Sequence, residues 1–180
     1  MLPAGPLMIE HRLIEKMIAL WAKELSFIAK TGQANVSFIE KGIDFMRTYA
    51  DRCHHGKEED ILFSCLKEKN LAKDLKGILD ELINEHAVAR KTVAALAKAK
   101  DKYGCGDKKS LGDIVQPIKL MTELYPSHIE KEDKHFFLPC MDYLNKQEQS
   151  KMLEEFREFD RLLIHEKYKS TVETLQADYR

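Results

Sequence analysis

Two six-residue stretches decide the fold, HHGKEE at residues 54–59 and HIEKED at residues 128–133. Each begins with a histidine that is followed four positions later by a glutamate, and each precedes aromatic and aliphatic residues. On an α-helix this spacing places the histidine and the glutamate on one face, about one turn apart. A neutral imidazole and a carboxylate arranged in this way can bind one metal ion, or bind one and bridge to a second. The two stretches therefore predict two helices that present metal ligands.

Two further histidines, each preceded by a glutamate, extend this pattern into a repeat. They are Glu10-His11 near the start of the chain and Glu85-His86 near its middle. His54 follows His11 by 43 positions. His128 follows His86 by 42 positions, so the second copy of the pattern is offset from the first by about 75 residues. This doubling predicts two similar halves, related by a pseudo-twofold axis that passes through one site.

Apolar residues recur at helical spacing along most of the chain, and strand signals are absent. Gly32 is expected to end the first helix. Ser37 with Glu40, and Asn145 with Glu148, have the spacing of helix-starting caps. Pro117 and Pro126 are expected either to kink the fourth helix or to split it in two. The predicted helices span about Pro6–Lys30, Ser37–Lys69, Leu71–Lys100, Leu111–Leu144 and Gln147–Leu175, with a loop at residues 101–110.

The lengths of these helices place the four histidines at one level. At 1.5 Å per residue, the path from His11 to the end of its helix is roughly 28 Å, and the path back to His54 is roughly 26 Å. The legs around His86 and His128 match in the same way. We therefore predict an all-α fold, an up-down-up-down four-helix bundle with an extra C-terminal helix. Residues 1–180 are expected to form one domain, with the bundle at about 8–144 and the extra helix at about 147–175.

Composition excludes several classes of protein. The 180 residues carry 29 basic and 30 acidic side chains, a balance that does not favour nucleic acid or an anionic membrane as partner. No apolar run approaches the roughly 18 residues of a membrane span. The N-terminus lacks the basic region of a secretory signal, and the four cysteines form no C-x-x-C pair. We therefore expect a cytoplasmic protein, either a monomer or a homodimer.

The expected ligand set contains four imidazoles and two carboxylates, and no cysteine thiolate joins it. Such a set disfavours structural zinc and suits a pair of iron or manganese ions. Each ion would have two imidazoles and two carboxylate oxygens, which leaves positions for an oxo or hydroxo bridge and for a small ligand such as dioxygen, nitric oxide or peroxide. The predicted ligands are His11, His54, Glu58, His86, His128 and Glu132.

These residues resemble the hemerythrin-like family, also called the HHE cation-binding domain. The resemblance covers about residues 8–144 and includes Glu59 and the Leu62-Phe63 pair after the first His-x-x-x-Glu unit. It implies a non-haem di-iron centre in a four-helix bundle. Oxygen-carrying hemerythrins have a further histidine where this chain has Arg90, so the site is similar to the four-histidine, two-glutamate branch. That branch includes iron–sulfur repair proteins and the iron-sensing domain of an F-box protein.

The missing imidazole favours redox or nitric-oxide chemistry over reversible oxygen carriage. The function we expect is therefore a di-iron protein that binds or reduces dioxygen, nitric oxide or peroxide. The alternative is an iron or oxygen sensor, or a store, without turnover. A structural bundle that holds a different metal is a third, weaker reading.

Other residues near the pattern have plainer expected roles. His55 is expected outside the ligand set or at the surface, although a shift of register would exchange it with His54. His135 shares the face of His128 and forms a ferritin-type unit with Glu132, but no second unit of that type exists in the sequence. Tyr125 is expected either to face the site as a proton donor or to belong to the core. His165 is expected at the surface.

Overall fold

The computed structural model describes the backbone of residues 1–178 and the side chains of residues 1–163. Within that range the chain is helical and contains no strand, as predicted. The first helix is α1 (Ala4–Thr31). The second is continuous through α2 (Val36–Phe45), the π-helices η1 (Met46–His55) and η2 (Glu58–Phe63), and α3 (Ser64–Lys67). The remaining elements are α4 (Lys73–Gly104), the 3₁₀ turn η3 (Lys108–Ser110), α5 (Leu111–Lys131), the π-helix η4 (Glu132–Phe136), α6 (Phe137–Met141) and α7 (Lys146–Asp178).

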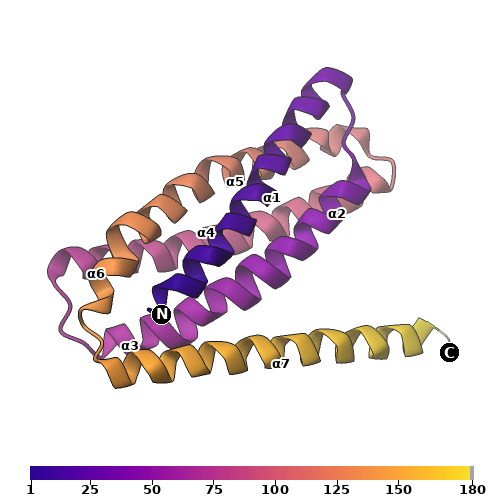
Figure 1. Ribbon diagram of the computed structural model, residues 1–180. Helices are drawn as coiled ribbons and strands as arrows, with labels where there is room; N and C mark the ends of the chain where they lie inside the picture. The colour runs from indigo at the N-terminus through magenta and orange to yellow at the C-terminus, as the bar shows by residue number, and fades with distance from the viewer. Residues whose placement is uncertain (179–180) are drawn as a thin grey trace.

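Four antiparallel rods form the bundle, and α7 runs along one side of it (Figure 1). The first rod is α1, the second is the helix from α2 to α3, the third is α4, and the fourth is the continuous helix from α5 through η4 to α6. The helix α1 packs against α5 and η1, and α4 packs against α5 and α2. The predicted up-down-up-down bundle with an added C-terminal helix is therefore confirmed. None of the described helices is long and apolar enough to cross a membrane.

The apolar core is divided into two clusters. One lies toward the far end of α1 and includes Ile14, Trp21 and Met121, whereas the other includes Leu7, Phe63 and Phe136. His11 lies between Leu7 and Ile14 on α1, so a layer of polar side chains separates the two clusters. The two apolar clusters stabilise the bundle on both sides of that layer. The polar side chains of the layer are therefore not needed for apolar packing.

The helix ends follow local capping signals, with one correction. Gly32 has a positive φ of 66° and its N–H bonds to the carbonyl of Ile28, so it ends α1 as expected. The predicted start at Ser37 and Glu40 is wrong, because the cap is Asn35, whose side chain accepts a hydrogen bond from the N–H of Phe38. Asparagine is as effective a cap as serine, and Glu40 instead pairs with Lys100.

Two other predictions concerned the prolines of the fourth helix and the end of the third helix. The helix α5 continues through Pro117 and Pro126 and is not split. The third helix continues to Gly104, beyond the predicted end at Lys100. The cause is Tyr103, which is buried in the core and whose hydroxyl accepts a hydrogen bond from the N–H of Ala34. Tertiary contacts therefore extend this helix into a stretch where glycines predicted a loop.

The start of α7 is a confirmed capping box. The Asn145 side chain accepts hydrogen bonds from the N–H groups of Gln147 and Glu148, and Glu148 in turn accepts from the N–H of Asn145. Met152 and Phe156 then bury themselves against the second apolar cluster. The first half of α7 therefore packs on its own bundle, whereas the side chain of His165 lies outside the described residues.

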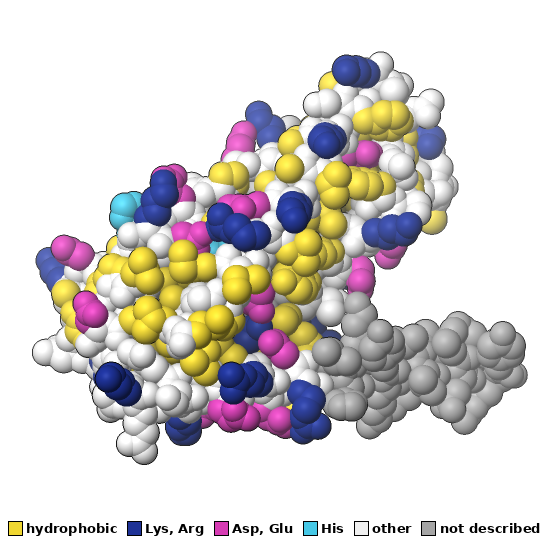
Figure 2. Space-filling view, in the orientation of Figure 1, with side chains coloured by type: hydrophobic (Ala, Val, Ile, Leu, Met, Phe, Trp, Pro, Cys, Tyr) yellow, Lys and Arg dark blue, Asp and Glu magenta, His cyan; other side chains and the backbone are white. Residues whose placement is uncertain are grey.

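On the face shown in Figure 2, basic and acidic side chains are interspersed among apolar ones, and neither sign forms a continuous patch. This distribution agrees with the balanced charge of the sequence.

Candidate metal centre

The six predicted ligands meet in the polar layer between the two apolar clusters. All six side chains are buried. They come from every rod of the bundle: His11 from α1, His54 and Glu58 from the second helix, His86 from α4, and His128 and Glu132 from the fourth. The four histidines therefore lie at one level of the bundle, as the matching helix lengths predicted.

Each of the two glutamates reaches imidazoles on more than one helix. One oxygen of Glu58 lies 3.3 Å from Nε2 of His54, and its other oxygen lies 3.5 Å from Nε2 of His86. Glu132 places one oxygen 3.1 Å from Nε2 of His11 and 3.3 Å from Nε2 of His128. Both carboxylates therefore lie between imidazoles that come from different helices.

The other ring nitrogen of each histidine is held by a carboxylate. Because a charged carboxylate can only accept, Nδ1 is the donor in each pair, and Nε2 points inward and offers a lone pair when the ring is neutral. Such carboxylate–histidine pairs orient metal ligands and raise their basicity. The four pairs are His11 with Asp133 at 2.7 Å, His54 with Glu10 at 2.9 Å, His86 with Glu59 at 2.7 Å, and His128 with Glu85 at 2.8 Å.

These pairs explain the doubled sequence pattern. Glu10 and Glu85, which precede His11 and His86 in the sequence, hold the histidine of the His-x-x-x-Glu unit in their own half. Glu59 and Asp133, which follow the two units, hold the first histidine of the opposite half. Glu59 and Asp133 are therefore hydrogen-bond acceptors for imidazoles of the centre.

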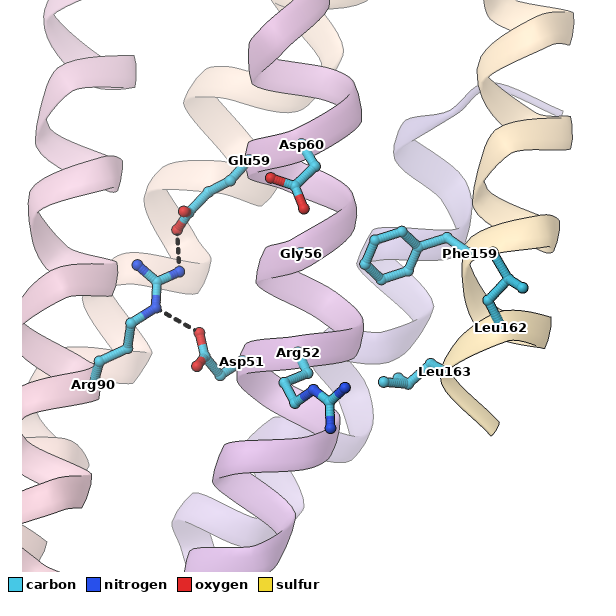
Figure 3. Close-up of a pocket in the computed structure, with 9 residues that line it drawn as sticks. All are labelled: Asp51, Arg52, Gly56, Glu59, Asp60, Arg90, Phe159, Leu162 and Leu163. Carbon is cyan, nitrogen blue, oxygen red and sulfur yellow. Dashed lines mark hydrogen bonds and ion pairs between the residues drawn. The ribbon is translucent and has the colours of Figure 1, made fainter. Parts of the chain in front are cut away.

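A cation pairs with each of these four carboxylates from outside. Arg90 is one of these cations, and its guanidinium bonds to Glu59 and to Asp51 (Figure 3). These ion pairs neutralise the outer carboxylates and hold them in place. The pairs are Lys57 with Glu10, Arg90 with Glu59, Lys131 with Glu85, and Arg12 with Asp133.

Burial and neighbouring charge shift the pKa values of the central groups in opposite directions. Burial holds the pKa of His54 well below its usual range, so this imidazole is neutral. Burial also opposes the charged form of His11, but the neighbouring carboxylates of Asp133 and Glu132 outweigh it and raise the pKa of His11 to about 9. Burial, with the adjacent charge of Glu132, raises the pKa of Glu58. Glu132 itself is desolvated, yet the neighbouring imidazoles of His128, His11 and His86 hold its pKa well below the ordinary value.

The inward atoms fit a cation. Nε2 of His11, His54, His86 and His128 and both oxygens of Glu58 and Glu132 are buried and lack a hydrogen-bond partner. Buried polar atoms without partners are unfavourable, and this many in one place is the mark of a site for an ion. The ligand atoms of His11, His54, Glu58 and Glu132 lie within 4.8 Å of one another. The protein therefore has clustered nitrogen and oxygen ligands that can hold a metal ion.

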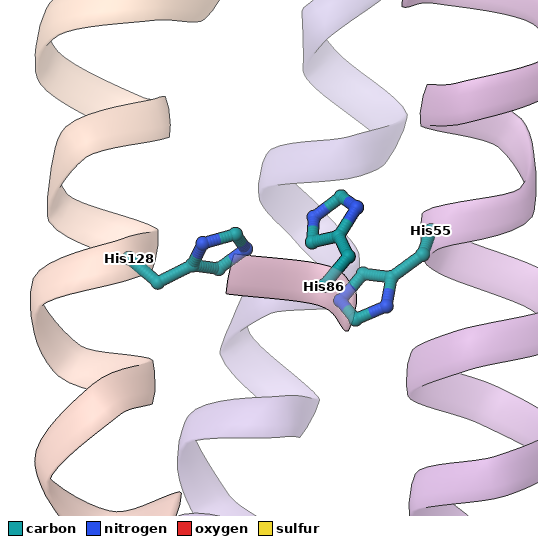
Figure 4. Close-up of side chains that lie close together, drawn as sticks. All are labelled: His55, His86 and His128. Carbon is teal, nitrogen blue, oxygen red and sulfur yellow. The ribbon is translucent and has the colours of Figure 1, made fainter. Parts of the chain in front are cut away.

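His55 is the residue that sequence reasoning placed incompletely. Of the two positions expected for His55, the one at the surface is wrong, because His55 is only 1 % exposed. It lies beside His86 and His128 (Figure 4), with one ligand atom from each of the three within 4.8 Å of the others. However, the rings of His55 and His86 stack at 3.8 Å with an angle of 13°. Because the lone pair of an imidazole lies in the ring plane, two stacked rings do not point at one ion. His55 thus supports His86 from outside the ligand set.

The π-helices account for this inward position of His55. A π-helix has a wider turn than an α-helix, with i to i+5 hydrogen bonds, and occurs frequently at functional sites. The wider turn brings consecutive residues closer to one face, so both members of the 54–55 pair point into the bundle. The adjacent histidines were the only signal in the sequence.

Of the two remaining candidates, His135 lies away from the centre and Tyr125 lies beside it. His135 is exposed, so the ferritin-type unit with Glu132 does not form. Tyr125 is buried in the core and also borders the centre, since its ring lies 6.0 Å from that of His128 and 6.4 Å from that of His55. Burial raises the pKa of Tyr125, so its phenol keeps its proton.

Four antiparallel helices around a layer of imidazoles and carboxylates define a helical-bundle protein with a metal-binding site. Comparison with known families matches residues 5–140 to the hemerythrin HHE cation-binding domain. The chain therefore belongs to this family, and the resemblance found in the sequence is confirmed. No curated protein and no solved structure matches the chain. The assignment to the four-histidine, two-glutamate branch stays a prediction.

Proposed function

We propose that the protein is a non-haem di-iron protein that binds or reduces a small ligand, namely dioxygen, nitric oxide or peroxide. The observation that carries this proposal is the position of Glu58, whose two oxygens face imidazoles on different helices, at 3.3 Å and 3.5 Å. One carboxylate that faces two sets of nitrogen ligands suits two ions better than one. The absence of thiolate from the cluster favours iron or manganese over structural zinc.

The chain would hold the two ions with two groups of ligands. His11 and His54 would bind one ion, His86 and His128 would bind the other, and Glu58 and Glu132 would bridge them. An iron pair in this set would supply redox cycling and an open coordination position for a small ligand. The carboxylates on Nδ1 of each histidine would keep the four imidazoles in the metal-binding tautomer.

A cavity beside the centre supports a small ligand. It has a volume of about 200 Å³ and lies next to His55 and Tyr125, which flank the imidazoles of His86 and His128. This volume is below the roughly 300–1,000 Å³ of pockets for drug-sized ligands. Met46, Ala89 and Val93 form the apolar part of its wall, and Arg47, Asp51 and Arg90 form the charged part. Tyr125, which keeps its proton, also lines the cavity and would be a hydrogen-bond donor for a ligand there.

A second candidate function is an iron or oxygen sensor, or an iron store, without turnover. It is favoured by the tight packing among His55, His86 and His128, where the space has no room for a water molecule. A centre closed in this way would retain its metal and exchange ligands slowly. The two functions differ in whether the reduced protein consumes nitric oxide or peroxide through repeated cycles.

Metal analysis of the full chain from iron-replete cells, with its visible spectrum, tests the proposal. We expect about two irons per chain, and near-ultraviolet bands that bleach on reduction and return in air. Glu58→Ala and His128→Ala should each lose metal. His135→Ala is the matched control, because it removes an exposed histidine from the same helix and should keep both irons. No iron, a single zinc, or metal that survives both changes would rule out the proposed site.

A further inference from the structure

Lys57 is a fully buried cation next to the centre. Its side chain is 0 % exposed, and its ammonium donates hydrogen bonds to Glu10 and to Asp160, the latter at 2.7 Å. A buried ammonium is unfavourable unless carboxylates compensate it. Lys57 therefore depends on two acids, and one of them comes from α7, outside the four-helix bundle.

Glu10 transmits the position of Lys57 to the centre. One of its oxygens accepts the hydrogen bond from Lys57, and the other accepts from Nδ1 of His54 at 2.9 Å. Asp160 also accepts a hydrogen bond from the thiol of Cys53, one residue before His54, at 3.3 Å. A continuous series of polar contacts therefore joins α7 to an imidazole that faces the bridging carboxylates.

In the second half of the molecule, the corresponding lysine is paired with two acids without any contribution from α7. There Lys131 takes the place of Lys57 and donates to Glu85 at 2.6 Å, and Glu85 holds His128. The second acid bound to Lys131 is Glu81, at 2.9 Å, one helical turn before Glu85 on α4. The position one turn before Glu10 on α1 is Pro6, which has no acid to offer. Asp160 therefore supplies the acid that the first half lacks.

We propose that α7 completes the metal centre through Asp160, a positioning residue that holds Lys57 against Glu10 and thereby fixes the imidazole of His54. This inference rests on the proposed metal-binding function. It assigns a role to a helix that begins after residue 140, where the family match ends.

The close approach of α7 depends on a glycine next to the histidine pair. Phe159 lies over Gly56 in the second helix (Figure 3), and a Cβ at residue 56 would lie 2.6 Å from Cζ of Phe159. A side chain at residue 56 would displace the ring of Phe159, the residue next to Asp160. Gly56 thus permits the contact that brings Asp160 to the centre.

Stepwise metal titration of the full chain against a competing chelator tests the proposal, with Fe²⁺ as the probe. Asp160→Asn removes the charge and keeps the shape of the side chain, and it should weaken one of the two binding steps by about 3- to 10-fold. This loss is smaller than the 10- to 100-fold expected for a residue that touches a ligand directly. Asp160→Glu should recover part of the affinity. Gly56→Ala should act like Asp160→Asn, because it displaces the same contact.

Glu154→Ala is the matched control. It removes an exposed acid from α7 whose described partner is Arg157 on the same helix, so both binding steps should keep their wild-type affinity. If the wild type binds two ions and Asp160→Asn binds them with unchanged affinities, α7 has no positioning role. If the wild type binds no metal, both the proposed function and this inference are wrong. If Asp160→Asn does not fold, Gly56→Ala and Asp160→Glu still decide between the outcomes.

Discussion

At the scale of single residues, the carboxylate behind each imidazole decides which nitrogen faces the centre. Glu85 illustrates this, because it accepts a hydrogen bond from Nδ1 of His128 at 2.8 Å. That hydrogen bond also lowers the pKa of Glu85, so the carboxylate is charged at neutral pH. The charged form binds the Nδ1–H most strongly and leaves Nε2 as the metal-binding atom.

Removal of this charge should therefore weaken metal binding. We expect Glu85→Gln to lower the affinity for Fe²⁺ by about 10- to 100-fold, measured by chelator competition. Glu81→Gln is the control, since Glu81 lies one turn away and contacts Lys131 but not His128. Equal affinities for the two variants would show that the contact with His128 does not tune the centre.

The protonation of His11 gives a pH prediction. Its pKa of about 9 in the metal-free protein means that the ring is charged at pH 7. Because the raised pKa belongs to the folded chain, the protonated ring stabilises the metal-free fold below about pH 6.5, and this contribution is lost as the pH rises through about 9. A metal ion must displace this proton, so affinity for Fe²⁺ should keep rising between about pH 7 and pH 9. An affinity that is constant above pH 7 would contradict this assignment.

Sequence spacing was sufficient to find the six inward side chains but not all of their partners. The four-residue interval puts His54 with Glu58, and His128 with Glu132, on one face whether the turn is α or π. It does not reveal that Glu10 reaches across to His54, because that contact depends on how two helices pack. The burial of His55 could not be chosen over an exposed position for a related reason, since nothing in the composition of residues 46–55 signals a π-helix.

At the scale of helices, glycines mark where two helices approach closely. Gly42 on α2 lies against the buried indole of Trp21 on α1, and a Cβ at residue 42 would lie 3.0 Å from Cε2 of Trp21. A glycine in the middle of a helix is intrinsically unfavourable. Its presence here is explained by the packing of the large indole against the backbone.

Gly42→Ala should therefore destabilise the protein by about 1–3 kcal/mol, the usual cost of overpacking a core. Gly77→Ala is the matched control, because Gly77 also lies within a helix but a Cβ there would meet no atom within 4 Å. That change should stabilise the protein by about 0.4–1 kcal/mol. Thermal unfolding of the two variants measures both effects, and a stabilising Gly42→Ala would show that Trp21 can move aside.

At the scale of the whole molecule, the two halves of the chain form one centre that neither half could form alone. Asp133 in the second half holds His11 in the first, and Glu59 in the first holds His86 in the second. This reciprocity ties the helices together across the bundle, and it follows from the repeat found in the sequence. The contribution of α7 breaks the symmetry and was not predictable, because only packing brings Asp160 to Lys57.

The cavity beside the centre belongs to the same scale, because three rods bound it. Met46 comes from the second helix, Ala89 from α4 and Tyr125 from α5. If a small ligand reaches the centre through this cavity, a larger side chain at its wall should slow the ligand. Ala89→Leu places three extra carbons in a space of about 200 Å³. We expect it to slow nitric oxide association with the reduced, iron-loaded protein by about 10-fold, a change of about 1.4 kcal/mol in the barrier.

Stopped-flow measurement of nitric oxide association checks this expectation, with iron content measured in parallel. Ala95→Leu is the matched control, because Ala95 is exposed on the same helix and lines a different pocket, formed with Pro117 and Leu120. Ala95→Leu should keep its iron. Ala89 also lines the narrow space between His86 and His128, so the association rate of Ala89→Leu is compared with that of the wild type at equal iron content. Association at the wild-type rate in Ala89→Leu with iron retained would mean that ligands reach the centre by another path. A slow rate in Ala89→Leu alone would identify this cavity as the route from solvent to the centre.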